Sequence, residues 1–297
     1  MTPMINWAWR ESARLEAGWR VRSKFVLAAM RESSLARRLE KIDPASALGR
    51  LAAEWPDTTA FLIWPYQCAA WNAPSRFERL EEHFRAVGAI PGLDLSTDEK
   101  LVLVDLDSFS PNTSLIIDRA KWLSREGHLT LSLFKGEFRA FTVSFSLSKH
   151  PETEIFIGGI QGRQSDDALA LYRDLTKDFH GVRPRDFMLE ALRLFALAIG
   201  AKHIYAVADD QKISRHPYFG KKGPSGLFYD EIWTERGGNR VADTHFELPL
   251  EGSRRELDDI APKKRSMYRR RYQMFDDIAA MMPKDFRRAE RRKFNAR

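Results

Sequence analysis

Cysteine is almost absent from this 297-residue chain: Cys68 stands alone, so no disulfide can form within it. The chain also lacks a run of the ~18 apolar residues that a membrane-spanning helix needs. Its first twenty residues contain no uninterrupted apolar segment of the kind found in secretory signals. We therefore expect a cytoplasmic protein, with peripheral contact at the inner membrane as an open alternative.

Several catalytic motifs are missing as well. There is no G-x-x-x-x-G-K-[S/T] loop, no H-E-x-x-H or paired-cysteine motif, and no G-x-S-x-G elbow. The glycines of the run Gly158-Gly159-Ile160-Gln161-Gly162 are too closely spaced for a dinucleotide fingerprint. Nucleoside triphosphate hydrolysis, hydride transfer and zinc chemistry are thus disfavoured, and we expect no metal.

Negative charge is scarce at the C-terminal end. Residues 263–297 hold 13 Lys/Arg against 4 Asp/Glu, whereas residues 1–262 hold 35 against 37. The segment KKRSMYRRRYQMFDDIAAMM predicts a basic helix, which either docks on the body or meets an anionic membrane. We expect the final residues, 286–297, to be frayed, and any binding of this tail to nucleic acid to be nonspecific.

Hydrophobic periodicity divides the rest of the chain into two regions. Residues 1–95 show helical spacing, and a serine at position 75 is the expected cap of a helix that runs to Gly88. From 96 to 262 the pattern changes to alternation and predicts five consecutive strands, with Gly136 in a hairpin turn. Residues 228–232 are a weaker strand candidate. We expect an α+β fold with a mixed, mainly antiparallel sheet flanked by helices.

The most informative stretch runs from Ile155 to Asp209. A glycine-bearing strand is followed by a polar helix, a turn with two arginines, an apolar helix and a second strand. The turn places Arg183 and Arg185 at a helix N-terminus, where free backbone N–H groups and the helix dipole favour anions.

This order of elements resembles the core of GNAT-type acyltransferases. In that core, the pantetheine arm of the acyl donor pairs with a strand and its pyrophosphate sits at the N-terminus of the following helix. The resemblance implies CoA, acyl-CoA or carrier-protein phosphopantetheine as co-substrate. The residues that would bind it are Gly159, Gln161, His180, Gly181, Arg183 and Arg185. The chain departs from the GNAT pattern because a helix over residues 166–179 separates the strand from the turn.

The same resemblance nominates Tyr218, in the segment RHPYFGKKG, as the acid that protonates the departing thiolate. The base that accepts a proton from the attacking amine would be Glu154 or His216. The alternative is structural: Tyr218 packs against its neighbours and Arg183 pairs with a carboxylate.

A second resemblance covers most of the chain, from about Leu51 to Met282. The motifs HGVRPRD, YDEIWTERGG, ELP and KKRSMYRRRY together resemble the VirK/YbjX family of Gram-negative bacteria, which is linked to virulence and envelope stress. Two functions remain open. One is acyl transfer to an amine or hydroxyl of a small molecule, peptide or envelope component. The other is non-enzymatic binding of anionic membrane or a partner through residues 263–297.

Overall fold

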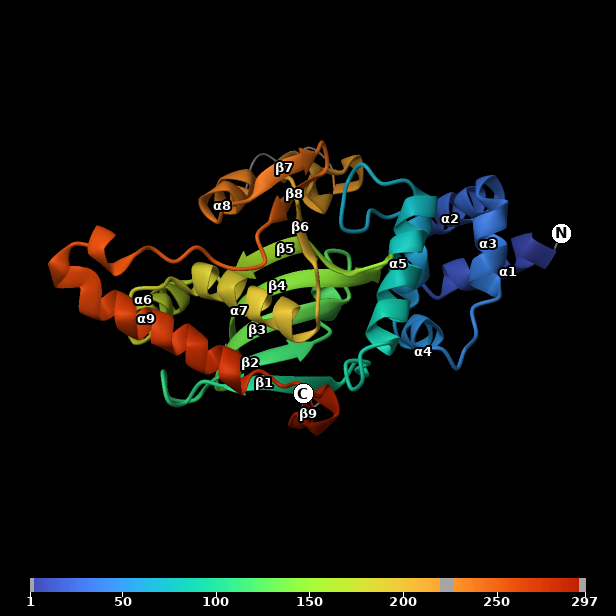
Figure 1. The fold of residues 1–297 in the computed structure, drawn as a ribbon. Coiled ribbons are helices and arrows are strands. Elements are labelled where there is room, and N and C mark those ends of the chain that lie inside the picture. Colours follow the sequence, from blue (N-terminus) through green and yellow to red (C-terminus); the bar gives the residue numbers. More distant parts are fainter. Residues whose placement is uncertain (1–2, 220–226, 294–297) are drawn as a thin grey trace.

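A computed structural model describes residues 3–219 and 227–293, and its centre is a nine-stranded sheet (Figure 1). The strands are β1 (Glu99–Asp105), β2 (Thr113–Asp118), β3 (Leu129–Lys135), β4 (Phe138–Lys149), β5 (Thr153–Gly162), β6 (His203–Val207), β7 (Asn239–Ala242), β8 (His245–Leu248) and β9 (Arg291–Lys293). Their order is β7-β8-β6-β5-β4-β3-β2-β1-β9. Among these strands β5 and β6 form the one parallel pair, and the other neighbours are antiparallel.

Alternation along the strands explains how the sheet is buried. Leu131 pairs with Val143, and both belong to the main apolar core. The next pair, Ser132 and Thr142, points to the opposite face, where the two hydroxyls lie 3.0 Å apart. Successive side chains of a strand point to opposite faces. One face is therefore apolar. The other carries small polar side chains, a buried Arg139–Asp118 pair and a small apolar cluster that includes Ile116 and Phe134.

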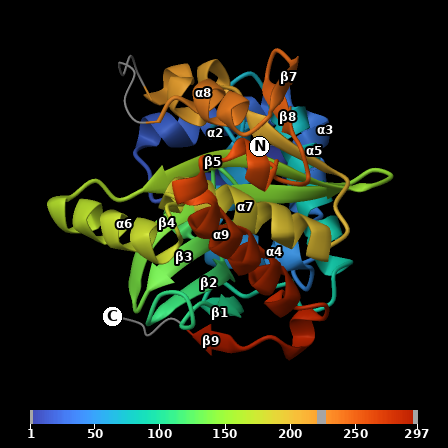
Figure 2. The same cartoon turned by 60° about the vertical axis from the view of Figure 1, so that its left-hand side comes forward.

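Nine α-helices lie in the described parts of the chain. They are α1 (Pro3–Ala13), α2 (Trp19–Arg31), α3 (Ser33–Glu40), α4 (Ala47–Glu54), α5 (Ala73–Gly88), α6 (Asp166–Asp178), α7 (Pro184–Ala198), α8 (Tyr229–Glu235) and α9 (Pro262–Met281). The apolar helix α7 packs on β3, β4 and β5, and α9 crosses outside α7 (Figure 2). Because α7 is covered on both sides, its side chains are apolar around much of its surface.

Helices α1 to α4 gather at one end of the sheet and form a second apolar core with part of α5 (Figure 1). The side chain of Asn72 caps α5 by accepting a hydrogen bond from the Ser75 N–H. The expected serine cap was therefore misplaced: Ser75 lies inside the first turn and the helix begins at Ala73. The division at residues 95 and 262 stays a prediction, although residues 274, 278, 282 and 286 share the main core with the sheet.

Two local expectations were wrong. Residues 229–235 form helix α8, because hydrogen bonds between its first turn and the loop after β6 secure its start. The segment after α9 is not frayed throughout its described part: Phe286 is buried and residues 291–293 pair with β1 as strand β9. The expected α+β class, with a mainly antiparallel sheet and an N-terminal helical region, is confirmed. No helix in the described ranges has both the length and the apolar content to cross a bilayer.

Candidate functional site

The sheet opens between its two parallel strands. Strand β5 pairs with β6 from Glu154 to Ile157, and a register shift in its pairing with β4 follows at Gly158. Beyond that point β5 continues to Gly162 against β4, while β6 ends at Val207. A bulge of this kind bends a strand and alters its twist. The last residues of β5, from Gly158 to Gly162, therefore separate from the chain that follows β6. We call this opening the fork.

The carboxylate of Glu126 lies against β5 at the fork, and two glycines make room for it. A Cβ atom on Gly158 would stand 2.0 Å from the backbone oxygen of Glu126. A Cβ atom on Gly159 would stand 1.8 Å from the Oε2 atom of the same residue. Since real Cβ atoms do not come this close to other atoms, any larger residue at either position would displace Glu126. The two glycines of the strand thus position a carboxylate.

Glu126 is half-buried, and its surroundings change its protonation. Gln161 donates from Nε2 to both carboxylate oxygens, at 2.9 and 3.1 Å. Burial raises the pKa of Glu126 to about 7, although the Gln161 hydrogen bond and the charge of Lys212 act in the opposite direction. A carboxyl group with this pKa exchanges protons near neutral pH, which is the property required of a general base or acid.

Tyr229, the first residue of α8, occupies the edge of β5 that β6 leaves unpaired. The Ile160 N–H donates to the phenol oxygen at 2.9 Å, and the phenol donates to the Ile160 carbonyl at 3.2 Å. Burial raises the pKa of the Tyr229 phenol, and the nearby Glu126 carboxyl raises it further. Tyr229 therefore remains protonated, and its O–H is held by the Ile160 carbonyl at the fork.

The chain after β6 completes the site. Asp209 accepts a hydrogen bond from the Tyr229 N–H at 3.0 Å and pairs with Lys212 at 2.7 Å. The Lys212 ammonium also lies 4.4 Å from the centre of the Tyr229 ring. A cavity of about 220 Å³ lies between these groups and β5. It is lined by Glu126, Gly158, Ile160, Gln161, Gly162, Gln164, Lys212, Ile213, Ser214, Leu227 and Tyr229.

The arginine turn lies near the same end of β5, but it is only partly open. His180 and Gly181 both have positive φ, and the His180 carbonyl accepts two hydrogen bonds from Arg271. Arg185 pairs with Asp186 at 3.0 Å and with Glu235 at 2.8 Å, so its charge is compensated. Arg183 is exposed at the start of α7.

Arg183 borders a shallow groove of about 520 Å³ between α6 and α7. The groove is lined by Phe141, Leu169, Tyr172, Arg173, Thr176, Arg183, Pro184 and Arg185. Tyr172 links it to the fork, because its hydroxyl accepts a hydrogen bond from the backbone N–H of Arg163, the residue after β5. An apolar floor with cationic edges is suited to a ligand that has both apolar and anionic parts.

The three residues expected to be catalytic lie on different elements: Glu154 is on β5, whereas His216 and Tyr218 follow β6. Glu154 lies near the start of β5, about 23 Å along the strand from Gln161 at 3.3 Å per residue, and accepts a hydrogen bond from Ser148. Tyr218 packs edge-on against Trp64 of the helical region, with ring centres 5.9 Å apart. His216 accepts a hydrogen bond from the backbone N–H of Tyr218. For Tyr218, this geometry matches the structural alternative.

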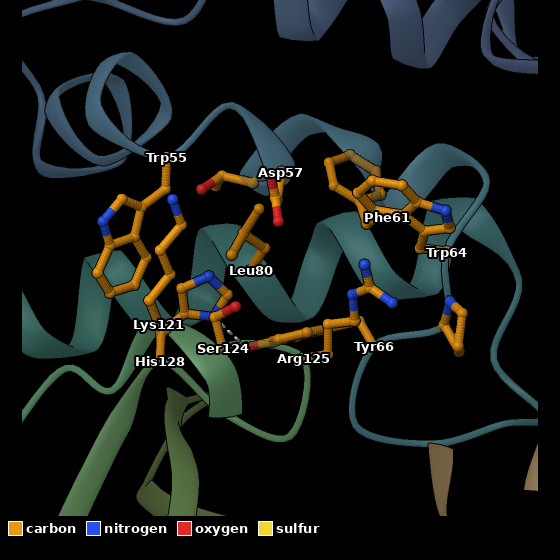
Figure 3. Close-up of a pocket in the computed structure, with 12 residues that line it drawn as sticks. Trp55, Asp57, Phe61, Trp64, Tyr66, Leu80, Lys121, Ser124, Arg125 and His128 are labelled. Atoms are coloured by element: carbon orange, nitrogen blue, oxygen red, sulfur yellow. Dashed lines mark hydrogen bonds between the residues drawn. The ribbon is translucent and has the colours of Figure 1, made fainter. Parts of the chain in front are cut away.

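A second cavity lies where the helical region meets the sheet (Figure 3). Trp55, Phe61 and Trp64 approach it from one side, and Arg125 and His128 approach it from the other. Burial lowers the pKa of His128 to about 3, and its Nδ1 atom lies 3.0 Å from the Tyr66 hydroxyl. The volume is about 20 Å³, enough for a single water molecule. This space is too small for a substrate.

Sequence reasoning singled out Gly159 and Gln161 but missed Glu126 and Tyr229, which meet them at the fork. The paired glycines were the available signal, because a double glycine inside a strand marks a close approach by another group. Nothing in the run Arg125-Glu126-Gly127 separates this glutamate from a surface residue. Within residues 3–219 and 227–293, no group of three or more His, Cys, Asp or Glu is placed to hold a metal ion.

Comparison with known proteins gives a family without a described activity. Residues 16–284 match the model of the family described as "Protein of unknown function (DUF535)". The chain is 32% identical over 209 residues to the uncharacterized protein YbjX of Escherichia coli, covering 69% of this chain and 61% of that relative. It is also 32% identical over 165 residues to an uncharacterized protein of Haemophilus influenzae, covering 52% of this chain and 51% of the relative. No solved structure matches it.

Proposed function

The chain belongs to the DUF535 family, and we propose its function from the geometry of the fork, because the relatives named above are uncharacterized. The proposed function is acyl transfer from a thioester donor to an amine or hydroxyl. The observation that carries this proposal is the Glu126 carboxyl, held against Gly159 and Gln161 beside the strand edge that β6 leaves and Tyr229 occupies. The parting of β5 and β6 is further support, because the proposal needs a donor site beside the end of a strand.

Glu126 is the proposed general base. Its carboxylate accepts a proton from the acceptor amine or hydroxyl as that group attacks the thioester carbonyl carbon. The new bond to carbon forms, the carbon–sulfur bond breaks, and the sulfur leaves as a thiolate. The protonated Glu126 carboxyl then returns this proton to the thiolate, and Tyr229 lines the same cavity and holds the edge of β5 through Ile160. This assignment replaces Glu154, His216 and Tyr218.

The donor would approach along the end of β5 and the groove beside α6. Arg163 and Arg183 are the proposed contacts for its phosphates, since both are exposed cations at this end of the strand. Arg185 is a poorer candidate because two carboxylates already neutralise it. The N-terminus of α6 is also unfavourable, because Asp166 and Asp167 occupy its first turn.

The test is turnover of acyl-CoA thioesters of graded chain length, with and without a set of amine acceptors, followed by the release of free thiol. We expect the purified chain to consume a thioester faster when a suitable amine is present. Glu126→Gln should lower the rate by roughly 100-fold or more, the usual contribution of a general base. Glu78→Gln, which alters an exposed glutamate on α5, is the matched control and should retain the wild-type rate.

Two results would contradict the proposal. The first is that CoA and acyl-CoA leave the melting temperature unchanged and no thioester is consumed, because a native-state ligand must stabilise the fold by mass action. The second is turnover that survives Glu126→Gln. The first result would favour the non-enzymatic alternative, binding of an anionic membrane or a partner through residues 263–297. The second would remove Glu126 as the general base.

A further inference from the structure

Helix α2 exposes a stripe of large apolar side chains to solvent, interrupted by Ser23. The exposed fractions of Trp19, Leu27 and Met30 are 72%, 65% and 46%. At 3.6 residues per turn, these three positions fall within about 80° of arc on the helix. Phe25 and Ala29 are fully buried against the other helices of the region. The exposed stripe is therefore not the face that holds α2 in the fold.

A row of cations runs beside this stripe. Arg20, Lys24 and Arg31 are exposed at spacings of four and seven residues, and α2 contains no carboxylate. Arg31 has one weak partner, Glu32, at 3.7 Å. On the other flank, Arg22 lies 4.8 Å from the ring centre of Trp9, which reaches across from α1. This face of α2 thus combines large apolar side chains with positively charged ones.

Helix α9 does not offer the same combination. Its cations Lys263, Lys264 and Arg269 are exposed. Of its apolar residues, Met274 and Ile278 are buried in the main core, and Met281, at the last position of the helix, is 41% exposed. A membrane contact through α9 would rest mainly on charge. A contact through α2 would add apolar insertion, which stable interfacial binding requires. Figure 1 shows α1 to α3 at the end of the molecule away from α6 and α9.

We propose that the outer face of α2, flanked by Trp9, docks on an anionic lipid surface. Tryptophan favours the level of the headgroups, where its ring is apolar and its N–H is hydrated. Leu27 and Met30 would enter the boundary with the acyl chains. Arg20, Lys24 and Arg31 would meet lipid phosphates, as juxtamembrane basic residues do. This inference does not depend on the acyl-transfer proposal.

The test is sedimentation of the full chain with vesicles, using phosphatidylglycerol mixed with phosphatidylcholine and, separately, pure phosphatidylcholine. We expect binding to the anionic vesicles that weakens with added salt, together with a blue shift of tryptophan fluorescence. The variant Arg20→Gln/Lys24→Gln/Arg31→Gln should bind roughly 100-fold more weakly. Trp19→Ser/Leu27→Ser should lose the binding while keeping the net charge of the chain.

The matched control is Lys263→Gln/Lys264→Gln/Arg269→Gln, which removes three exposed cations from α9 instead. Binding should persist in this variant. The proposal is overturned if the α9 variant loses binding and the α2 variants keep it. The proposal is also overturned if the chain does not bind anionic vesicles and instead forms a dimer that Trp19→Ser/Leu27→Ser disrupts. Unchanged melting temperatures would show that each variant remains folded.

Discussion

At the scale of single residues, the site is defined by the carboxyl group of Glu126, whose burial disfavours its charged form. Glu126 carries its charge in a half-buried position, where Gln161 and Lys212 offset only part of the free energy of desolvation. The sequence could predict Gly159 and Gln161, because a double glycine stands out within a strand. It could not predict Glu126, because the contact joins positions more than thirty residues apart, and their meeting depends on how the chain enters β3.

The raised pKa of Glu126 makes a prediction about stability. In the unfolded chain this carboxyl titrates near 4.5, whereas burial raises its pKa to about 7 in the fold. The folded state therefore binds the proton more tightly, and this group costs stability as pH rises from 4.5 through 7. We expect Glu126→Gln to be more stable than wild type at pH 8, by about 1–3 kcal/mol in urea denaturation. The difference should shrink towards pH 4.5. A destabilised variant at pH 8 would show that the charged carboxylate is favourable in the fold.

At the scale of elements, sequence patterns found the strands better than the ends of helices. Alternating residues in β3 and β4 and the glycine turn between them predicted the hairpin correctly. The pattern failed at α8, where Phe228, Asp230 and Ile232 alternate as in a strand. The carboxylates of Asp209 and Asp230 fix the helical start there by accepting hydrogen bonds from backbone N–H groups. Such contacts are tertiary and leave no mark on local periodicity.

The bend of β5 also gives a prediction at this scale. Gly158→Ala would place a Cβ atom 2.0 Å from the backbone oxygen of Glu126, and backbone atoms cannot move aside as a flexible side chain can. We expect a loss of about 1–3 kcal/mol, typical of overpacking. The control is Gly88→Ala in α5, where a Cβ atom meets nothing within 4 Å. That variant should be neutral or slightly more stable in the same denaturation experiment. Equal stability of the two variants would exclude close packing at Gly158.

At the scale of the whole molecule, the arrangement separates two surfaces. The groove is lined by residues of α6 and the start of α7. Helix α2 lies in the helical region at the opposite end of the molecule from α6 (Figure 1). The family resemblance and the α+β class followed from the sequence, because motifs and alternation extend over much of the chain. The position of the site did not, since it depends on where β5 and β6 part.

The most direct test of the account is the pH dependence of kcat/KM for acyl transfer by the wild-type chain and by Glu126→Gln. If Glu126 is the base, the wild-type value rises with pH through about 7, because only the deprotonated carboxylate accepts the proton of the acceptor. The variant should be slow and should lack this step in its profile. A wild-type profile that is flat across pH 7, or one that Glu126→Gln leaves unchanged, would contradict the account.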